Sequence, residues 1–402
     1  MKSINKFSNL KNLTFKELIY NNEVRALFIQ VATVVIIFSL FYVMIQNLNE
    51  NIEARDIVSG FTFLEGRSGF DILPFLGSYI VKFSPNSTNL EVFYVAIINT
   101  FVCAGVGIIL STILGLLIGI ARLSSNYLIS RLSNAYIELF RNIPILLQIL
   151  FWYNIFLNAL PHPKKSISFL DFIFINNRGF YLPNPIPQDG FLWVFIAFII
   201  GVGSAIYLKR HFKRKQDETG QQTNTIGYSL ALILLFPIVV FLLLGSPLQL
   251  DYAILGKFNL KGGLAIVPEF VALTLALSVY TATYIAEAIR SGIEAVDKGQ
   301  KEAAAAIGLT PIQSLKLVVL PQALRVAIPP TINQYLNLTK NSSLAAAIGY
   351  PELMSAFGGT VLNQVGQAIE ILTMVMLVYL VISLAISVLL NYVNKKMAIQ
   401  GR

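Results

Sequence analysis

The chain has 402 residues, of which 55% are apolar and only 13% are charged, and its mean hydropathy is +0.67. Soluble proteins carry about 25% charged residues, so this composition excludes an ordinary soluble enzyme, a disordered chain and a disulfide scaffold. The formal charge of +9 fits basic loops that face an anionic leaflet better than it fits nucleic-acid binding. A multi-span membrane protein is therefore the first class to test.

Eight apolar segments approach the length of about 20 residues that a membrane-spanning helix needs. The first has a longer apolar run than a signal peptide and lacks a small-residue cleavage pattern, so we interpret it as a retained anchor. The third and fourth are short, and the seventh is unusually polar. The segments are 26–45, 92–120, 143–160, 191–208, 227–245, 268–289, 327–347 and 367–392.

The distribution of Lys and Arg predicts the orientation of these spans. With the N-terminus inside, the inner segments hold 21 of the 30 Lys and Arg residues and the outer segments hold eight. Because cytoplasmic loops carry the excess of basic residues, we expect both termini to be cytoplasmic. We expect the outer segments 46–91 and 161–190 to be ordered loops rather than separate domains.

Few residues could carry covalent or metal chemistry. Cys103 lies in an apolar run, where we interpret it as a packing residue, and His162 and His211 lie in loops without a second ligand at metal spacing. No phosphate-binding glycine loop is present, so any ATPase must be another chain. We predict no catalytic residue, no metal and no cofactor.

The most specific stretch is the inner loop 302–321, EAAAAIGLTPIQSLKLVVLP. Glu302 begins a strong helix former, Gly308 can end that helix, and Thr310 followed by Pro311 can begin a second one. Apolar residues then repeat at helical spacing up to Pro321. We therefore expect two short helices at an angle, forming a docking knob; an amphipathic linker on the inner leaflet is the alternative.

This spacing resembles the EAA loop of ABC importer permeases. The matching residues are Glu302, Ala303, Ala304, Gly308, Val318, Leu320 and Pro321, with Val318 where the pattern usually has Ile. The resemblance implies an all-α, polytopic type I ABC importer transmembrane domain (MetI-like). It also implies that the loop sits in a cleft of an ATP-binding subunit and transmits its closure.

The flanking segments resemble polar amino-acid permeases of the histidine/glutamine type, and most closely the general L-amino-acid permease subfamily. The similar segments are 285–293, 299–302, 138–148, 338–344, Asn99–Thr100, 60–64 and 177–183. The resemblance implies an N-terminal region over residues 1–90 with the anchor and a long periplasmic loop. It further implies a transmembrane domain 91–392 with a helix pair inserted around 161–265, and a cytoplasmic tail 393–402.

Polar stripes on two predicted spans are candidates for a substrate path. Asn333, Asn337, Lys340 and Asn341 share one helical face of the seventh span, and Thr274, Ser278, Thr281 and Tyr284 share a stripe on the sixth. Asn99 of the second span is a further candidate. Lys340 lies near mid-membrane if its helix starts at Pro329–Pro330, where it could receive a substrate carboxylate. The alternative is that Lys340 has a structural partner and that the stripes join helices.

Other paired residues favour structural roles. Glu287 and Arg290 at the inner end of the sixth span are expected to form a structural ion pair rather than to contact substrate. Glu138 and Arg141 are interpreted in the same way, as interface anchors. A Gly-x-x-x-Gly pair in the second span, Gly115 and Gly119, favours close helix packing over a dimer seam.

The sequence therefore favours a permease subunit of a binding-protein-dependent ABC importer for polar, general L-amino acids in the inner membrane. The expected partners are an ATP-binding subunit, a periplasmic solute-binding protein, a different second permease, the amino-acid substrate and the bilayer. An ion-coupled secondary transporter is one alternative, although acids within the spans are nearly absent. A non-transporting scaffold or sensor subunit is the other, against which the polar stripes count.

Overall fold

The computed structural model describes residues 22–54, 59–73, 75–170, 172–220, 224–256 and 260–397. Contacts divide the chain into two units, one formed by 1–63 with 362–373 and the other by 64–361 with 374–402. The first 21 residues and the last five of the expected tail 393–402 lie outside the described residues.

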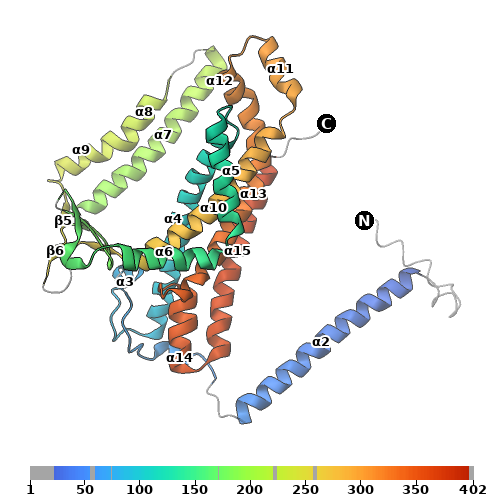
Figure 1. Ribbon diagram of the computed structural model, residues 1–402, viewed down its shortest axis with the longest axis vertical. Helices are drawn as coiled ribbons and strands as arrows, with labels where there is room; N and C mark the ends of the chain where they lie inside the picture. The colour runs from blue at the N-terminus through green and yellow to red at the C-terminus, as the bar shows by residue number, and fades with distance from the viewer. Residues whose placement is uncertain are drawn as a thin grey trace. The chain divides into compact units, whose positions relative to one another are not determined.

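Helices account for most of the described chain (Figure 1). The α-helices are α2 (Asn22–Ala54), α3 (Leu76–Val81), α4 (Asn89–Arg122), α5 (Tyr127–Asn142), α6 (Ile145–Ala159), α7 (Phe191–Thr219), α8 (Ile226–Leu230), α9 (Phe236–Leu243), α10 (Pro268–Glu294), α11 (Lys298–Ala306), α12 (Pro311–Ser314), α13 (Leu320–Asn341), α14 (Leu362–Val365) and α15 (Ala368–Met397). The 3-10 helices are η3 (Thr62–Glu65), η4 (Pro163–Lys165) and η7 (Ser342–Ala347), and the π-helices are η5 (Ala231–Leu235), η6 (Leu315–Val319) and η8 (Leu353–Val361).

The predicted all-α membrane architecture is confirmed. Among the described residues, seven helical segments are long and apolar enough to cross a membrane, and there are up to eight if one bent pair forms a single span. The seven are Arg25–Ile52, Asn89–Arg122, Phe191–Thr219, Ile226–Leu243, Pro268–Glu294, Pro311–Ala347 and Ala368–Val393.

The predicted third span, 143–160, does not form a spanning helix by itself. It corresponds to α6, which has 15 residues and turns by 102° from α5. Pro144 causes this break, because a residue before proline is driven to extended backbone, and Ile143 has φ −92° and ψ 127°.

The predicted seventh span, 327–347, is also corrected. Its helix begins at Pro311 and passes through Pro321, Pro329 and Pro330 without ending. A proline removes a backbone donor, and the π-helix η6 directly before α13 changes the hydrogen-bond register at this point. Lys340 lies in the last turn of α13, and the helical span continues through η7 to Ala347, so its expected position near mid-membrane stays a prediction.

Helix α10 forms the centre of the larger unit. It packs along α4, α13 and α6, and its apolar core joins Leu273 and Leu277 to Ile149, Leu338 and Cys103. Cys103 is fully buried, which confirms its packing role. Small residues on α10 also allow the neighbouring backbones to approach it.

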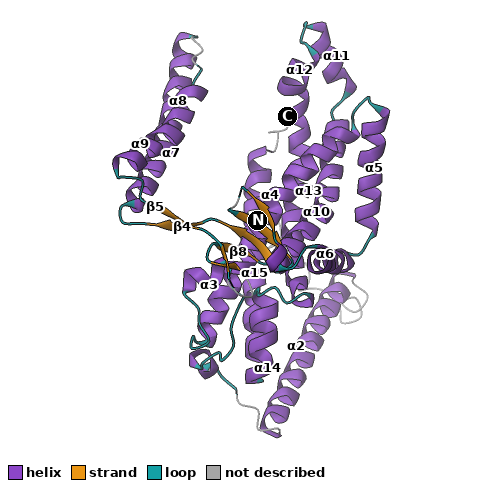
Figure 2. Cartoon of the chain, turned by 60° about the vertical axis from the view of Figure 1, so that its left-hand side comes forward, coloured by secondary structure: helices purple, strands orange, loops and turns teal. Residues whose placement is uncertain are grey.

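The inserted segment contains strands that the sequence did not predict. They gather beside α6 and the ends of α7 and α9 (Figure 2). A four-stranded antiparallel sheet has the order β1-β2-β3-β8, and Phe180 pairs with Ile266 across the insertion. The strands are β1 (Ile167–Phe169), β2 (Ile173–Asn176), β3 (Gly179–Leu182), β4 (Asn184–Pro187), β5 (Leu248–Asp251), β6 (Ile254–Leu255), β7 (Leu260–Lys261) and β8 (Leu264–Ile266).

Candidate functional site

The predicted docking knob forms a sharp elbow between α11 and α12. Helix α11 stops at Ala306, and Gly308 has φ +80°, a left-handed conformation that costs glycine little. The Gly308 N–H donates to Ala305 O at 3.0 Å, and the Leu309 N–H donates to Ala304 O at 3.1 Å. Gly308 therefore ends the first helix, as predicted from the sequence.

A capping box begins the second arm of the elbow. Thr310 Oγ1 accepts from the Gln313 N–H, while Gln313 Oε1 accepts from the Thr310 N–H at 2.9 Å, and Pro311 takes the first helical position. This confirms the predicted cap. The second arm is not a short helix, however, because it continues through η6 into α13. The second arm of the elbow is thus continuous with the helix that carries Lys340.

The elbow is fixed to α10 by a small apolar cluster. Val319 and Ala323 pack with Val296, which follows α10. At Gly292 the two helices are so close that a Cβ atom would lie 2.6 Å from Ala323 O. Within the EAA pattern, Ala304 is buried and Val318 is half-buried; Glu302, Ala303, Gly308, Leu320 and Pro321 are exposed.

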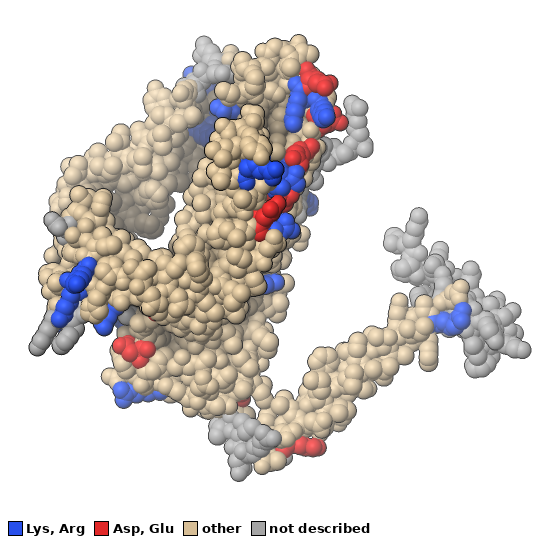
Figure 3. Space-filling view, in the orientation of Figure 1, with Lys and Arg blue, Asp and Glu red and all other residues tan. Residues whose placement is uncertain are grey.

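The outer surface of the elbow carries exposed apolar side chains. Ile307, Ile312 and Leu317 are 77%, 65% and 66% exposed. On the face shown in Figure 3, charged side chains gather over α11 and the helix end beside it, whereas the flank of the α7–α9 pair is mostly uncharged. Exposed apolar groups within a charged surface are typical of a site that binds another protein.

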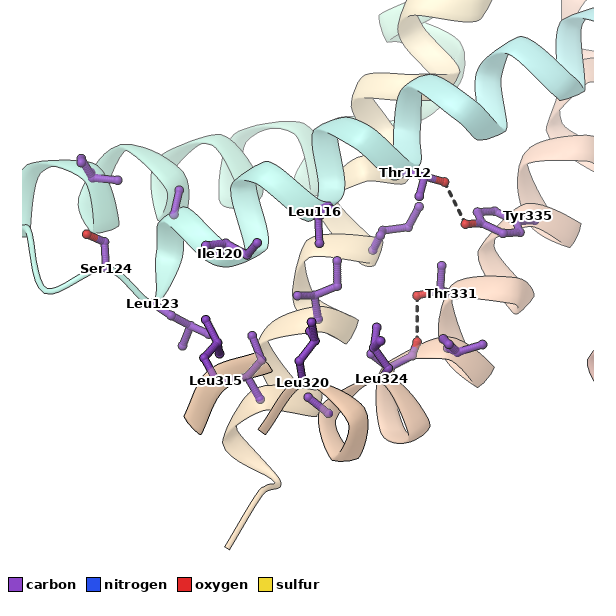
Figure 4. Close-up of a pocket in the computed structure, with 18 residues that line it drawn as sticks. Thr112, Leu116, Ile120, Leu123, Ser124, Leu315, Leu320, Leu324, Thr331 and Tyr335 are labelled. Carbon is purple, nitrogen blue, oxygen red and sulfur yellow. Dashed lines mark hydrogen bonds between the residues drawn. The ribbon is translucent and has the colours of Figure 1, made fainter. Parts of the chain in front are cut away.

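A large apolar cavity of about 770 Å³ lies behind the elbow, between α4, α10 and the start of α13. Figure 4 shows Leu315, Leu320 and Leu324 facing Leu116 and Ile120 across it, with Thr112 and Tyr335 hydrogen-bonded at 2.8 Å at one end. No charged residue among those described lines this cavity. It therefore does not suit a polar substrate.

A polar cavity of about 230 Å³ brings together most of the predicted stripe on the seventh span. Its wall includes Asn337, Lys340 and Asn341 from α13 and Tyr280 and Tyr284 from α10. The Tyr280 and Tyr284 hydroxyls share a hydrogen bond of 2.9 Å. The fourth predicted member, Asn333, is exposed and does not line this cavity.

The predicted stripe on the sixth span lies elsewhere. Thr274, Ser278 and Thr281 are at most 3% exposed. Thr274 Oγ1 donates to Phe270 O, and Ser278 Oγ donates to the Gly107 carbonyl of α4 at 3.4 Å. The structure thus places these three residues in the helix-packing core and only Tyr284 at the cavity.

Asn99 is held by the backbone of other segments. It is fully buried, its Oδ1 accepts from the Gly77 N–H at 3.0 Å, and its Nδ2 donates to Pro351 O at 2.9 Å. The Tyr350 hydroxyl donates to Asn99 O at 3.1 Å. Asn99 joins α3, α4 and the segment after η7, and it does not line the polar cavity at Lys340.

An ion-pair network lies at the end of α10 next to the elbow. Glu287 accepts from Arg290 as predicted, and also from Arg122 at the end of α4. Arg290 pairs further with Glu294.

Glu138 and Arg141, which the sequence favours as interface anchors, form no ion pair among the residues that the structure describes. The Arg141 guanidinium lies instead 5.2 Å from the centroid of the Tyr284 ring. A cation over an aromatic face is favourable but leaves the charge free for an anion. Arg141 thus packs against α10, and the role of Glu138 and Arg141 as interface anchors stays a prediction.

Sequence reasoning missed a second polar cavity of about 260 Å³. It is lined by Arg141, Tyr284, Glu287, Ser291, Pro330 and Gln334, among others. These residues come from three helices that are distant in sequence, so helical periodicity within one segment could not associate them. The signal that existed was the pair of charges, Arg141 and Glu287, which we interpreted as structural.

Comparisons with known proteins identify the family. A family model described as "Binding-protein-dependent transport system inner membrane component" matches residues 197–399. The "General L-amino acid transport system permease protein AapQ" of Rhizobium johnstonii is 46% identical over 389 residues, covering 97% of this chain and 96% of its own. The chain belongs to the family of binding-protein-dependent transport system inner membrane components.

Further relatives of this permease match at similar length. The "Putative amino-acid ABC transporter permease protein YhdX" of Escherichia coli is 46% identical, covering 95% of this chain and 96% of its own. BztB of Rhodobacter capsulatus, a "Glutamate/glutamine/aspartate/asparagine transport system permease protein", is 38% identical over 96% of both chains. A solved structure, "an amino acid ABC transporter with histidines", is 19% identical and has a TM-score of 0.46, covering 81% of this chain and 100% of that one.

Family membership defines the coarse role. The family is one of transport permeases rather than enzymes, and its members are multi-pass membrane subunits. A binding-protein-dependent ABC importer implies an ATP-binding subunit and a solute-binding protein as partners. Membership favours an importer permease over a secondary transporter or a scaffold.

Proposed function

We propose that this permease moves polar and other L-amino acids across the inner membrane as part of an ATP-driven importer. Relatives that match nearly the whole chain are named as amino-acid permeases, which supports the substrate class. Their printed names range from general L-amino acids to glutamate, glutamine, aspartate and asparagine. We therefore expect the permease to recognise the groups that amino acids share, the α-carboxylate and the α-ammonium.

The elbow between α11 and α12 is the observation that carries the coupling mechanism. Its surface presents Ile307, Ile312 and Leu317, and its second arm is continuous with the helix that lines the polar cavity. An ATP-binding subunit that grips this surface would move α13 as it closes. Binding energy from ATP is thereby converted into a change of access to the substrate path.

Lys340 is the proposed receiver of the substrate carboxylate in the polar cavity of about 230 Å³. It forms no ion pair with any residue that the structure describes, and an unpaired cation in a membrane segment is costly unless it meets an anion or water. Asn337 and Asn341 supply amide donors beside it. A charge-assisted hydrogen bond from Lys340 would compensate for the loss of carboxylate hydration.

The assembly that we propose has both termini in the cytoplasm and the elbow on the same side. A periplasmic solute-binding protein would deliver substrate at the opposite face, and a different permease subunit would complete the path as a heterodimer. The excess of basic residues in the predicted inner loops supports this orientation.

Reconstituted transport tests the proposal. The full complex in proteoliposomes should take up radiolabelled L-glutamine only when ATP, the ATP-binding subunit and the binding protein are all present. Uptake driven by an ion gradient alone, or no uptake of any L-amino acid, would overturn the proposal.

The matched variants Gly308→Asp and Gly349→Asp separate the role of the elbow in coupling from the effect of backbone strain. Both glycines have positive φ, +80° and +75°, and neither has a heavy atom within 4 Å of the added Cβ, so the backbone strain is similar. We expect Gly308→Asp to lower uptake at least tenfold while ATP hydrolysis persists. Gly349→Asp, away from the elbow, should retain uptake; equal uptake by both variants would count against the coupling role.

A further inference from the structure

Two polar cavities lie end to end along α13. Both are lined by Tyr284 and Gln334, so they share a wall. The first contains Lys340, and the second contains Arg141 and Glu287. Along α13 the lining positions run from Val326 to Asn341, a rise of about 22 Å at about 1.5 Å per residue.

Arg141 is a cation available to a ligand. Its guanidinium lies against the Tyr284 ring at 5.2 Å, and it forms no ion pair with any described residue. The ring stabilises and orients the guanidinium without neutralising its charge. The planar donor fork of arginine matches a carboxylate with two parallel hydrogen bonds.

Glu287 places a negative charge on the same cavity. Arg290 binds its Oε1 and Arg122 binds its Oε2, while 29% of the side chain remains exposed. Each carboxylate oxygen has two lone pairs, so a further donor can be accepted. The cavity thus presents a fixed cation on α5 and a fixed anion on α10 within about 260 Å³.

Such a pair selects for one chemical class. A ligand with only a carboxylate would leave the remaining lone pairs of Glu287 unused, because Arg290 and Arg122 already balance its charge. A ligand with only an ammonium would meet repulsion from Arg141. A zwitterion satisfies both groups, and an α-amino acid carries both charges on one carbon. Ser291 and Gln334 add polar groups for the backbone or side chain of such a ligand.

We propose that the Arg141–Glu287 cavity is a second binding station for zwitterionic α-amino acids, nearer the elbow than Lys340. This inference rests on the proposed function. The α-carboxylate leaves Lys340 and passes to Arg141, and the α-ammonium meets Glu287. Tyr284 and Gln334, which line both cavities, contact the substrate during the transfer.

Movement of the elbow acts on the walls of this station. Ser291 lines the cavity and is followed directly by Gly292, where α10 and α13 meet closely. Pro330 and Gln334 belong to α13, the continuation of the second arm of the elbow. A shift of that arm along α10 would therefore change the distance between the fixed charges and the α13 wall.

Cysteine labelling tests occupancy without relying on transport. The chain has one native cysteine, Cys103, and it is fully buried, so Ser291→Cys introduces a single accessible thiol on this chain. In the purified complex, L-glutamine should slow labelling of Ser291→Cys by a charged methanethiosulfonate several-fold. Glutaramic acid, which lacks only the α-amino group of L-glutamine, should not slow this labelling. Ala295→Cys, four positions further along and exposed, should be labelled at the same rate with either compound.

A transport experiment tests the cation. Arg141→Gln should lower L-glutamine uptake at saturating binding protein at least tenfold while binding-protein-stimulated ATP hydrolysis remains, and Arg141→Lys should restore a fraction of the uptake. Arg131→Gln is the matched control. Like Arg141, Arg131 lies over a tyrosine ring, here Tyr127 of its own helix α5, but it lines neither polar cavity.

The outcomes separate the two proposals. Three outcomes would overturn the second station. Arg141→Gln could take up L-glutamine like the wild type, or it could lose ATP hydrolysis together with uptake. L-Glutamine and glutaramic acid could also protect Ser291→Cys from labelling equally. If the wild-type complex transports no L-amino acid, the proposed function itself fails. If it transports L-glutamine but Ser291→Cys labelling is unchanged, only the second station fails.

Discussion

At the scale of single residues, Glu352 is the most unusual group outside the spans. It is fully buried, and its carboxylate accepts from the Met354 and Ser355 N–H groups and from the Tyr379 hydroxyl at 2.7 to 2.9 Å. Burial, the largest influence, raises its pKa from 4.5 to about 7, although the three hydrogen bonds act in the opposite direction. The carboxyl therefore titrates near neutral pH.

This shift predicts a pH-dependent stability. Because the folded protein holds the Glu352 proton more tightly than the unfolded chain does, the unfolding free energy should fall as pH rises from about 4.5 through about 7. Thermal unfolding of the purified complex at several pH values measures this. Glu352→Gln should flatten the slope over that range, and Glu138→Gln, an exposed control, should leave it unchanged. An unaltered slope in Glu352→Gln would contradict the prediction.

At the scale of elements, the contact between α4 and α10 depends on glycine. A Cβ atom at Gly115 would lie 2.6 Å from the Ile285 Cβ, and one at Gly119 would lie 2.9 Å from Ala286 O. The predicted close packing of this Gly-x-x-x-Gly pair is thus confirmed, and its partner is α10 of the same chain. Gly105, on the same helix, has nothing within 4 Å.

Two alanine variants exploit this difference. Gly115→Ala should destabilise the permease by about 1–3 kcal/mol, because overpacking forces the helices apart. Gly105→Ala should be neutral or stabilising by up to about 1 kcal/mol, since alanine favours a helix. Thermal unfolding in detergent compares the two variants. Equal melting temperatures would show that the contact between α4 and α10 tolerates the extra methyl group.

The second arm of the elbow gives an independent prediction. Thr310→Ala removes the side-chain cap of the capping box and should destabilise the start of α12 by about 1 kcal/mol. Hydrogen exchange measured on residues 310–315 should increase, whereas exchange in α11 should not. Thr310→Ser keeps the hydroxyl and should behave like the wild type.

At the scale of the whole molecule, the permease is expected to work only when another chain holds its elbow. Ile312 is 65% exposed there, and Ile254, in β6, is 71% exposed far from it along the chain. We expect Ile312→Glu to abolish co-purification of the ATP-binding subunit, because a charge would be buried in the interface. Ile254→Glu should leave co-purification intact, so that loss in both variants would indicate a folding defect.

The sequence alone determined much of the local structure. Gly308, Thr310 and Pro311 act through their own backbone preferences, so a helix end and a cap could be predicted at those positions. The apolar segments were predictable for the same reason, since membrane spans reflect local composition. Pro144 could also have indicated the break between α5 and α6.

Only the tertiary structure decided which polar residues meet. Thr274, Ser278 and Thr281 form a polar stripe in sequence, yet the packing of α10 among its neighbours buries that face. A second group, Arg141 with Glu287, shares a cavity because three helices distant in sequence converge there. Periodicity shows that a helix has a polar face; what that face contacts depends on neighbouring helices, and the sequence of one helix carries no record of them.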